Sequence, residues 1–153
     1  MDSELLVPLI VRWIHIVSAV FAVGGILFYY FIYMVVAAKA LTTESAAGLR
    51  FAIMKRWKPL LHPTIVIFLI TGFYTYLVET RFIHEGQPLY HALIGVKFLL
   101  AIFVFALFII MSSTLNWSAK FRDKKSMWLL LVLLSLSVIL IGGVLGILPT
   151  TPV

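Results

Sequence analysis

Residues 89–112, LYHALIGVKFLLAIFVFALFIIMS, form a continuous apolar run that contains one lysine, Lys97. A helix needs about 20 apolar residues to cross the hydrocarbon core of a bilayer, and this run has that length. Three further runs have the same character, at 6–38, 59–78 and 127–148. The chain of 153 residues is 63% hydrophobic and 12% charged, which is too apolar for a soluble core. We therefore expect a single all-α domain over residues 1–153, a bundle of four transmembrane helices.

The charges between these runs predict how the bundle is oriented. Nine of the twelve basic residues fall in the first and third connections, which the positive-inside rule places in the cytoplasm. The net charge of +6 is therefore an orientation signal, and we expect no nucleic-acid partner. Short connections favour an antiparallel up-down bundle. With the first and third connections in the cytoplasm, both termini are expected on the non-cytoplasmic side. We expect the membrane to be the inner membrane of a bacterium. The nine residues are Lys39, Arg50, Lys55, Arg56, Lys58, Lys120, Arg122, Lys124 and Lys125.

The first connection has two interpretations. Its segment 44–57 carries basic residues together with Phe51, Ile53 and Met54. This composition fits either a cytoplasmic loop with a helical turn or a short helix lying on the membrane surface. Pro59 is expected to begin the second transmembrane helix, because proline suits the first turn of a helix. Tryptophans at 57, 117 and 128 are expected to mark the membrane interface on this side.

Ionisable residues inside the apolar runs are costly and point to a functional site. Arg12, His15 and Lys97 all lie in the outer third of the bundle, at a rise of about 1.5 Å per residue. Arg12 and His15 share one face of their helix. Small residues converge on the same layer, either to let the helices pack closely or to make room for a flat ligand. The glycines among them are Gly25, Gly72, Gly95, Gly142, Gly143 and Gly146.

A buried histidine flanked by cations suits haem b. Neutral imidazole ligates the iron, and cationic side chains pair with the propionates. We expect His15 to be the axial ligand and Arg12 to be a propionate partner. Lys97 is expected to pair with a propionate, to donate a proton or to be the second ligand. His91 is either a further metal ligand or an interfacial histidine, and Gly25, Gly72 and Gly95 are expected to line the cofactor site.

Copper is the competing ligand. Thioether and imidazole groups suit Cu(I), and four methionines map near the cytoplasmic ends of the helices with His62. The chain has no cysteine, which excludes disulfides, thiolate metal sites and iron–sulfur clusters. A scaffold without a cofactor, in which the glycines pack helices together, is the third alternative. The copper ligands would come from His15, His91, His62, Met34, Met54, Met111 and Met127.

Several short motifs resemble the copper-resistance protein D (CopD-like) family. They are RWIHI at 12–16, the glycine pair at 24–25, TGF at 71–73 and GVKFLL at 95–100. That family is related to the HemJ-type protoporphyrinogen oxidases, four-helix membrane proteins. The resemblance implies that His15 binds haem b, that Lys97 matches the family's lysine in the third helix, and that copper uptake is an alternative.

The chain departs from the HemJ pattern at 31–34, where FIYM replaces a Pro-Arg-Leu segment. It also departs over 98–111, where the expected histidine is missing. A HemJ-like protoporphyrinogen oxidase is therefore kept as a second alternative, after copper transport. We expect a haem protein with a redox or electron-transfer role, compatible with an oxidoreductase. Its partners would be the lipid bilayer, a haem or porphyrin and a redox protein, and homo-oligomer formation is left open.

Overall fold

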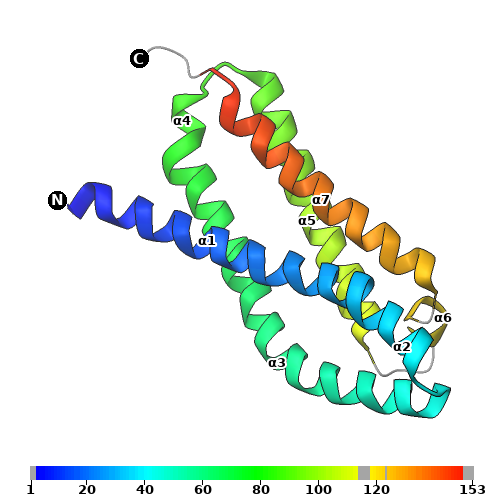
Figure 1. Ribbon diagram of the computed structural model, residues 1–153. Helices are drawn as coiled ribbons and strands as arrows, with labels where there is room; N and C mark the ends of the chain where they lie inside the picture. Colours follow the sequence, from blue (N-terminus) through cyan, green and yellow to red (C-terminus); the bar gives the residue numbers. More distant parts are fainter. Residues whose placement is uncertain (1–2, 114–117, 123, 150–153) are drawn as a thin grey trace.

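The computed structural model describes residues 3–113, 118–122 and 124–149, and every secondary-structure element in these ranges is a helix (Figure 1). The prediction of an all-α protein is confirmed. In chain order the elements are α1 (Ser3–Phe28), η1 (Tyr29–Tyr33), α2 (Met34–Ala40), α3 (Thr43–Tyr74), η2 (Thr75–Thr80), α4 (Arg81–Ile83), α5 (Pro88–Ser112), α6 (Ala119–Arg122) and α7 (Lys125–Ile147), where η denotes a π-helical segment.

Four helical rods are long and apolar enough to cross a membrane, which makes the chain a multi-pass membrane protein. The rods are Leu6–Ala40, Thr43–Ile83, Pro88–Ser112 and Lys125–Ile147. The first combines α1, η1 and α2, and the second combines α3, η2 and α4. The first three runs predicted from the sequence lie within these rods, and the fourth, 127–148, extends one residue beyond Ile147.

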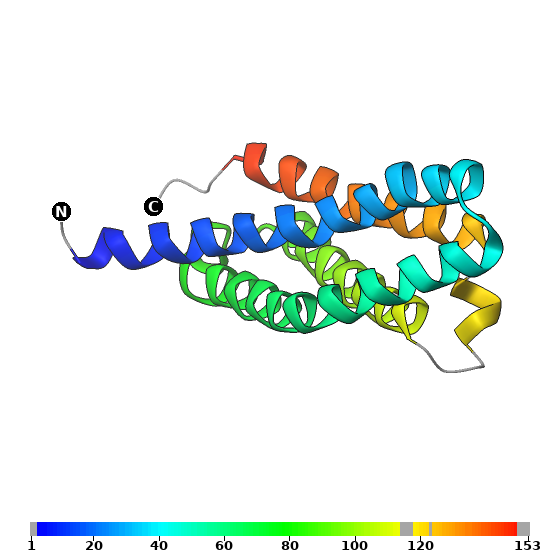
Figure 2. The same ribbon diagram turned by 60° about the horizontal axis from the view of Figure 1, so that its bottom comes forward.

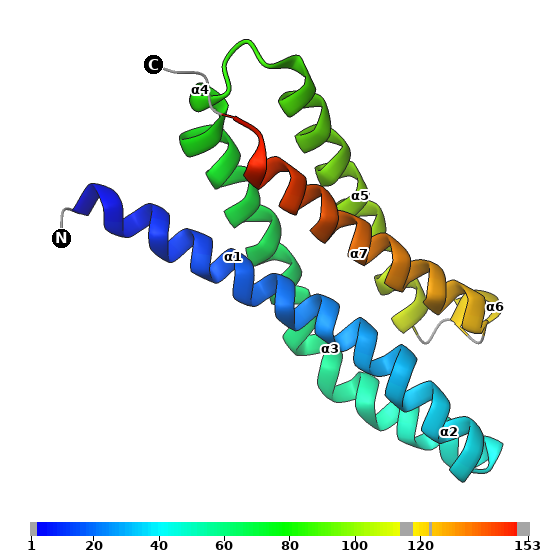
Figure 3. The same cartoon turned by 45° about the horizontal axis from the view of Figure 1, so that its top comes forward.

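The rods pack mainly as two pairs, α1 with α3 and α5 with α7. Figures 1 and 3 show that α1 begins and α7 ends at the same end of the bundle, where the two helices diverge. We call this the terminal end, and it also carries the turn at Gly86, which has a φ of +76°. Figure 2 shows the opposite end, where α2 meets α3 and α6 precedes α7. We call it the basic end, because the nine basic residues of the first and third connections lie in residues 39–58 and 120–125.

The second rod begins earlier than predicted. Residues 43–58 are not a loop or a separate surface helix, because α3 starts at Thr43 and continues through Pro59 and Pro63. The Thr42 side chain caps this start by accepting a hydrogen bond from the Ser45 backbone N–H at 3.3 Å. Membrane helices tolerate internal proline, because neighbouring helices and side chains satisfy the freed backbone groups. The curve of α3 in Figure 1 fits the presence of the two prolines.

The best-packed part of the core lies toward the basic end. Trp128 is 0% exposed, stacks on Tyr29 at a centroid distance of 4.0 Å and meets Phe108 edge-on. Its indole Nε1 donates to the Arg122 carbonyl at 2.9 Å, which ties α6 to α7. Trp128 is therefore a core residue of the protein, in contrast to the predicted interfacial anchor. Trp57 is half-buried and stacks on Phe21, whereas position 117 lies outside the described residues.

Candidate functional site

His15 projects from α1 onto α3. Its Nδ1 lies 3.1 Å from the Phe68 carbonyl oxygen and 3.0 Å from the Thr71 Oγ1. The imidazole also stacks on the Phe68 ring, with 4.3 Å between centroids and 20° between planes. These contacts hold the His15 ring in one orientation against α3.

The hydrogen bonds determine which nitrogen of His15 carries the proton. The Phe68 carbonyl can only accept, so Nδ1 must donate to it. The single Thr71 hydroxyl proton goes to a backbone carbonyl, since Oγ1 lies 2.7 Å from the Ile67 oxygen and 3.1 Å from the Phe68 oxygen. The neutral ring therefore has its lone pair on Nε2. This is the arrangement found in metal-binding histidines, whose second nitrogen donates to a carbonyl and fixes the ring.

Two glycines make room for the polar side chains. A Cβ added at Gly72 would lie 3.1 Å from Cε1 of His15 and 3.5 Å from Cε1 of Phe98. A Cβ added at Gly142 would lie 3.3 Å from the Lys97 Nζ. Gly72 therefore lets the imidazole approach α3, and Gly142 lets the ammonium group approach α7. The structure fills both positions with the protein's own side chains.

Lys97 faces the site from α5. It is half-buried and lies within electrostatic range of the His15 ring. Among the described residues, its Nζ has no hydrogen bond or ion pair. Arg12 lies one turn before His15 on α1 and is exposed. The predicted trio thus lies at the terminal end as an imidazole, a nearby amine and a more peripheral guanidinium group.

His91 occupies a separate contact. Its Nδ1 lies 3.1 Å from the Tyr76 hydroxyl, which joins α5 to η2. His84, in the turn that follows α4, is only 6% exposed. It stacks on Tyr90 at 3.6 Å, and its Nδ1 donates to Gln87 Oε1 at 2.9 Å. The Gln87 amide in turn donates to the Pro149 carbonyl at 2.9 Å, so this group fastens the turn to the end of α7.

The remaining predicted glycines lie apart from His15. A Cβ at Gly25 would overlap the Trp57 indole, so this glycine accommodates a tryptophan of α3. Gly25 is ten residues beyond His15, which corresponds to about 15 Å along the helix. Gly95 has no atom within 4 Å of an added Cβ and faces open space. Of the three predicted lining glycines, Gly72 is the one in contact with His15.

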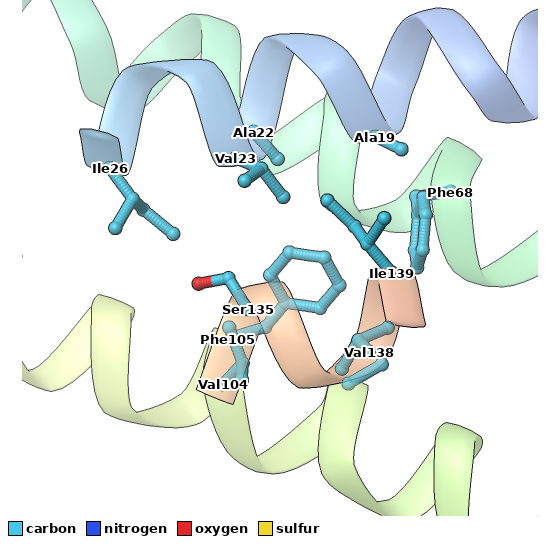
Figure 4. Close-up of a pocket in the computed structure, with 11 residues that line it drawn as sticks. Ala19, Ala22, Val23, Ile26, Phe68, Val104, Phe105, Ser135, Val138 and Ile139 are labelled. Carbon is cyan, nitrogen blue, oxygen red and sulfur yellow. The ribbon is translucent and has the colours of Figure 1, made fainter. Parts of the chain in front are cut away.

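The centre of the bundle contains a small, partly open apolar cavity of about 40 Å³ (Figure 4). Ser135 is its single polar lining residue, and Phe68, which stacks on His15, also lines it. A second cavity of about 50 Å³ lies beside Gly25 and Trp57. Ligand pockets usually span about 300–1,000 Å³, so neither cavity has room for a porphyrin.

The groups considered for copper lie elsewhere. The four methionines belong to the hydrophobic core or pack against it, and Met111 is 0% exposed. His62 is exposed on α3. Across residues 3–113, 118–122 and 124–149, no three His, Asp or Glu side chains come close enough together to hold a metal ion.

The sequence did not predict which residues contact His15 and hold it in place. Phe68 appears there as one of many apolar residues, and its carbonyl carries no sequence signal. Thr71 and Gly72 did appear as a dipeptide in the family resemblance, which was the available signal. Comparison of the chain with family models, curated proteins and solved structures gives no match. What the site binds is therefore inferred from its geometry.

Proposed function

We propose that this protein binds haem b at the terminal end of the bundle, with His15 Nε2 as the axial ligand to the iron. The observation that carries the proposal is the pair of contacts from His15 Nδ1 to Phe68 and Thr71. They leave Nε2 with the lone pair that a metal requires and fix the ring before a ligand arrives. This chain resembles the HemJ-type proteins at His15, and their first-helix histidine, which binds haem b, adds support.

The proposed orientation follows from charge. Nine basic residues at the basic end place that end in the cytoplasm under the positive-inside rule. The terminal end, where α1 begins, α7 ends and His15 lies, would then face the non-cytoplasmic side of a bacterial inner membrane. A haem held there would supply a one-electron iron couple, which supports a redox or electron-transfer role with a partner protein.

The side chains at the site suit haem binding, whereas the cavities of the bundle are too small for it. His15 Nε2 fits an axial bond, and Lys97 and Arg12 provide cations for the propionates. The two small cavities do not fit a porphyrin. The proposal therefore requires the ring to lie outside the closed core, toward the terminal end where α1 and α7 diverge (Figure 3).

The decisive experiment is an absorption spectrum of the purified full-length protein, oxidised and reduced, after expression with a haem precursor. We expect a Soret band that His15→Ala abolishes. His62→Ala is the matched control, because this exposed histidine on α3 should leave the band unchanged. Absence of a Soret band in the unmodified protein, or equal haem content in His15→Ala, would contradict the proposal.

Metal analysis of the same preparation addresses the copper alternative. Haem binding predicts iron in proportion to the Soret band and copper at background level. Near-stoichiometric copper without a Soret band would replace haem binding by copper handling. No contact among the described residues favours copper transport or protoporphyrinogen oxidation over haem binding.

A further inference from the structure

The central cavity is lined by side chains from all four rods. Buried lining residues include Ala22 of α1, Phe68 of α3, Ala101 of α5 and Val138 of α7. In Figure 4 the side chains of α1 and those of α7 point toward one another across the cavity. Ala101 and Ser135 lie near the midpoints of α5 and α7. The cavity therefore lies close to the mid-plane of the membrane that these helices cross.

The lining of the cavity does not suit water. Ser135 is the single polar lining residue, and its hydroxyl proton goes to the Leu131 carbonyl one turn earlier in α7. A buried water molecule typically makes about three hydrogen bonds, and the Ser135 oxygen offers one acceptor. Apolar cavities of this kind stay dry and take up apolar molecules such as xenon. The occupant that matches the lining is therefore apolar.

The size of the cavity limits this occupant to a few atoms. Its volume of about 40 Å³ is roughly three times the space that one water molecule requires. It is also roughly a quarter of the volume of an engineered cavity that holds benzene. A diatomic gas or a single xenon atom matches this range, whereas a ring compound is too large.

The cavity is accessible from the lipid. It is partly open, and Ile139, which belongs to its lining, is 50% exposed on α7. Apolar molecules prefer hydrocarbon to water, so the bilayer concentrates a dissolved gas at the depth of the cavity. A gas molecule therefore reaches the cavity without crossing a polar surface.

We propose that this cavity binds a small apolar gas molecule such as dioxygen. Dispersion contacts with Ala22, Ala101 and Val138 would hold the molecule, since no polar group is needed for its recognition. Phe68 lines the cavity and also stacks on the His15 ring at 4.3 Å between centroids. The bound gas would therefore be separated from the His15 imidazole by one aromatic ring. Gas binding does not depend on a haem at His15.

The test is methyl NMR spectroscopy of the full chain in detergent micelles under increasing xenon pressure. The methyl signals of Ala22 and Val138 should shift along a saturating curve, as the filling of one site requires. Val20 and Leu140 lie on the same two helices, are 67% and 68% exposed, and should shift only in proportion to the pressure. A proportional response at Ala22 and Val138 as well would overturn the site, because it would show only xenon dissolved in the micelle.

Two alanines of α5 provide a matched pair of variants. Ala101 lines the cavity and is 4% exposed, whereas Ala106 is exposed. Ala101→Leu adds three carbon atoms to the cavity and should abolish the saturating shift at Val138. Ala106→Leu adds the same atoms toward the lipid and should leave that shift unchanged. Equal responses in the two variants would overturn the site.

A variant with more room keeps the test decisive, because Ala101→Leu also overpacks the core. Val138→Ala enlarges the cavity and should retain the saturating shift at Ala22. Loss of xenon binding in this variant would overturn the site.

Dioxygen itself is the final probe. It is paramagnetic, so replacing nitrogen by dioxygen should accelerate relaxation of the Ala22 and Val138 methyl groups, and Ala101→Leu should remove this effect at Val138. Unchanged acceleration in Ala101→Leu would contradict dioxygen binding. Direct magnetisation transfer from a detergent chain to the Ala22 methyl group would replace the gas by an acyl chain as the occupant.

Discussion

The two ends of the bundle are packed in different ways. Toward the basic end, Trp128, Met111 and Leu131 are completely buried. Toward the terminal end, none of residues 6–17 of α1 is buried, and contacts are made by hydrogen-bonded His15, His84 and Gln87. Local stability in proteins follows buried apolar contact, so the terminal end is expected to open more readily. A candidate ligand site at the looser end is consistent with entry of a ligand there.

The largest predicted effect comes from the basic end. Trp128→Ala removes a fully buried indole that contacts Tyr29, Phe108 and the Arg122 carbonyl. The free energy of unfolding in mixed micelles should fall by about 3–5 kcal/mol. Leu140→Ala is the control, because Leu140 is 68% exposed and should change stability little. Equal losses in the two variants would refute the contrast between the ends.

A pair of neighbouring glycines gives the next effect. Gly25→Ala would drive a methyl group into the Trp57 indole and should destabilise the protein by about 1–3 kcal/mol. Gly24→Ala meets no atom within 4 Å and should stabilise the helix by up to roughly 1 kcal/mol. The two midpoints of thermal unfolding should therefore move in opposite directions. A shift of the same sign and size in both variants would contradict the prediction that only Gly25 is required to accommodate Trp57.

Gln87→Ala tests the polar fastening of the terminal end. It removes the acceptor of buried His84 and the donor to the Pro149 carbonyl, so stability should fall by about 1–2 kcal/mol. Backbone amides near Gln87 should exchange hydrogen faster, while those around Trp128 should not change. Gln87→Glu keeps an acceptor for His84 and loses the donor, so it should have an intermediate effect. Faster exchange over the whole chain would contradict independent ends.

The smallest effect is expected at Thr71. Thr71→Val removes one of the two acceptors of His15 Nδ1, and the Phe68 carbonyl remains, so stability should fall by about 1 kcal/mol. Thr64→Val is a matched control, since Thr64 also bonds a carbonyl of its own helix but has no contact with His15. If haem binds at His15, Thr71→Val should shift the Soret band and Thr64→Val should not. Identical spectra would argue that Thr71 does not orient the ligand.

The sequence predicted the helices well because they depend on local composition. Apolar length alone located the four rods, and loop charge located the basic end. The start of α3 was predicted wrongly because Pro59 was taken as the first residue of the helix. The capping side chain, Thr42, lies seventeen residues before Pro59. Capping at Thr42 and packing along α3 outweighed the proline signal.

The sequence predicted which residues belong to the candidate site, but it did not predict the contacts that they make. His15 and Lys97 were recognisable because ionisable groups are rare in apolar runs. The residues that contact His15 depend on how α1 and α3 are rotated about their axes. No pattern in the sequence indicates these rotations. The same limit explains Gly25, which was assigned to the cofactor layer because it is small. Its neighbour Trp57 comes from a helix whose rotation the sequence did not reveal.

The π-helical segment η1 has a consequence for the direction in which His15 faces. Within it, the Met34 backbone N–H bonds to the Tyr29 carbonyl five residues back, so the turn contains one more residue than an α-helical turn. If the same five residues were wound as a regular α-helix, they would turn further by about 100°, and everything before them would rotate by that angle relative to α2. His15 would then turn away from Thr71 although its own sequence surroundings were untouched. The winding of the aromatic segment Tyr29–Tyr33 therefore determines the rotation of α1 that turns the His15 imidazole toward α3.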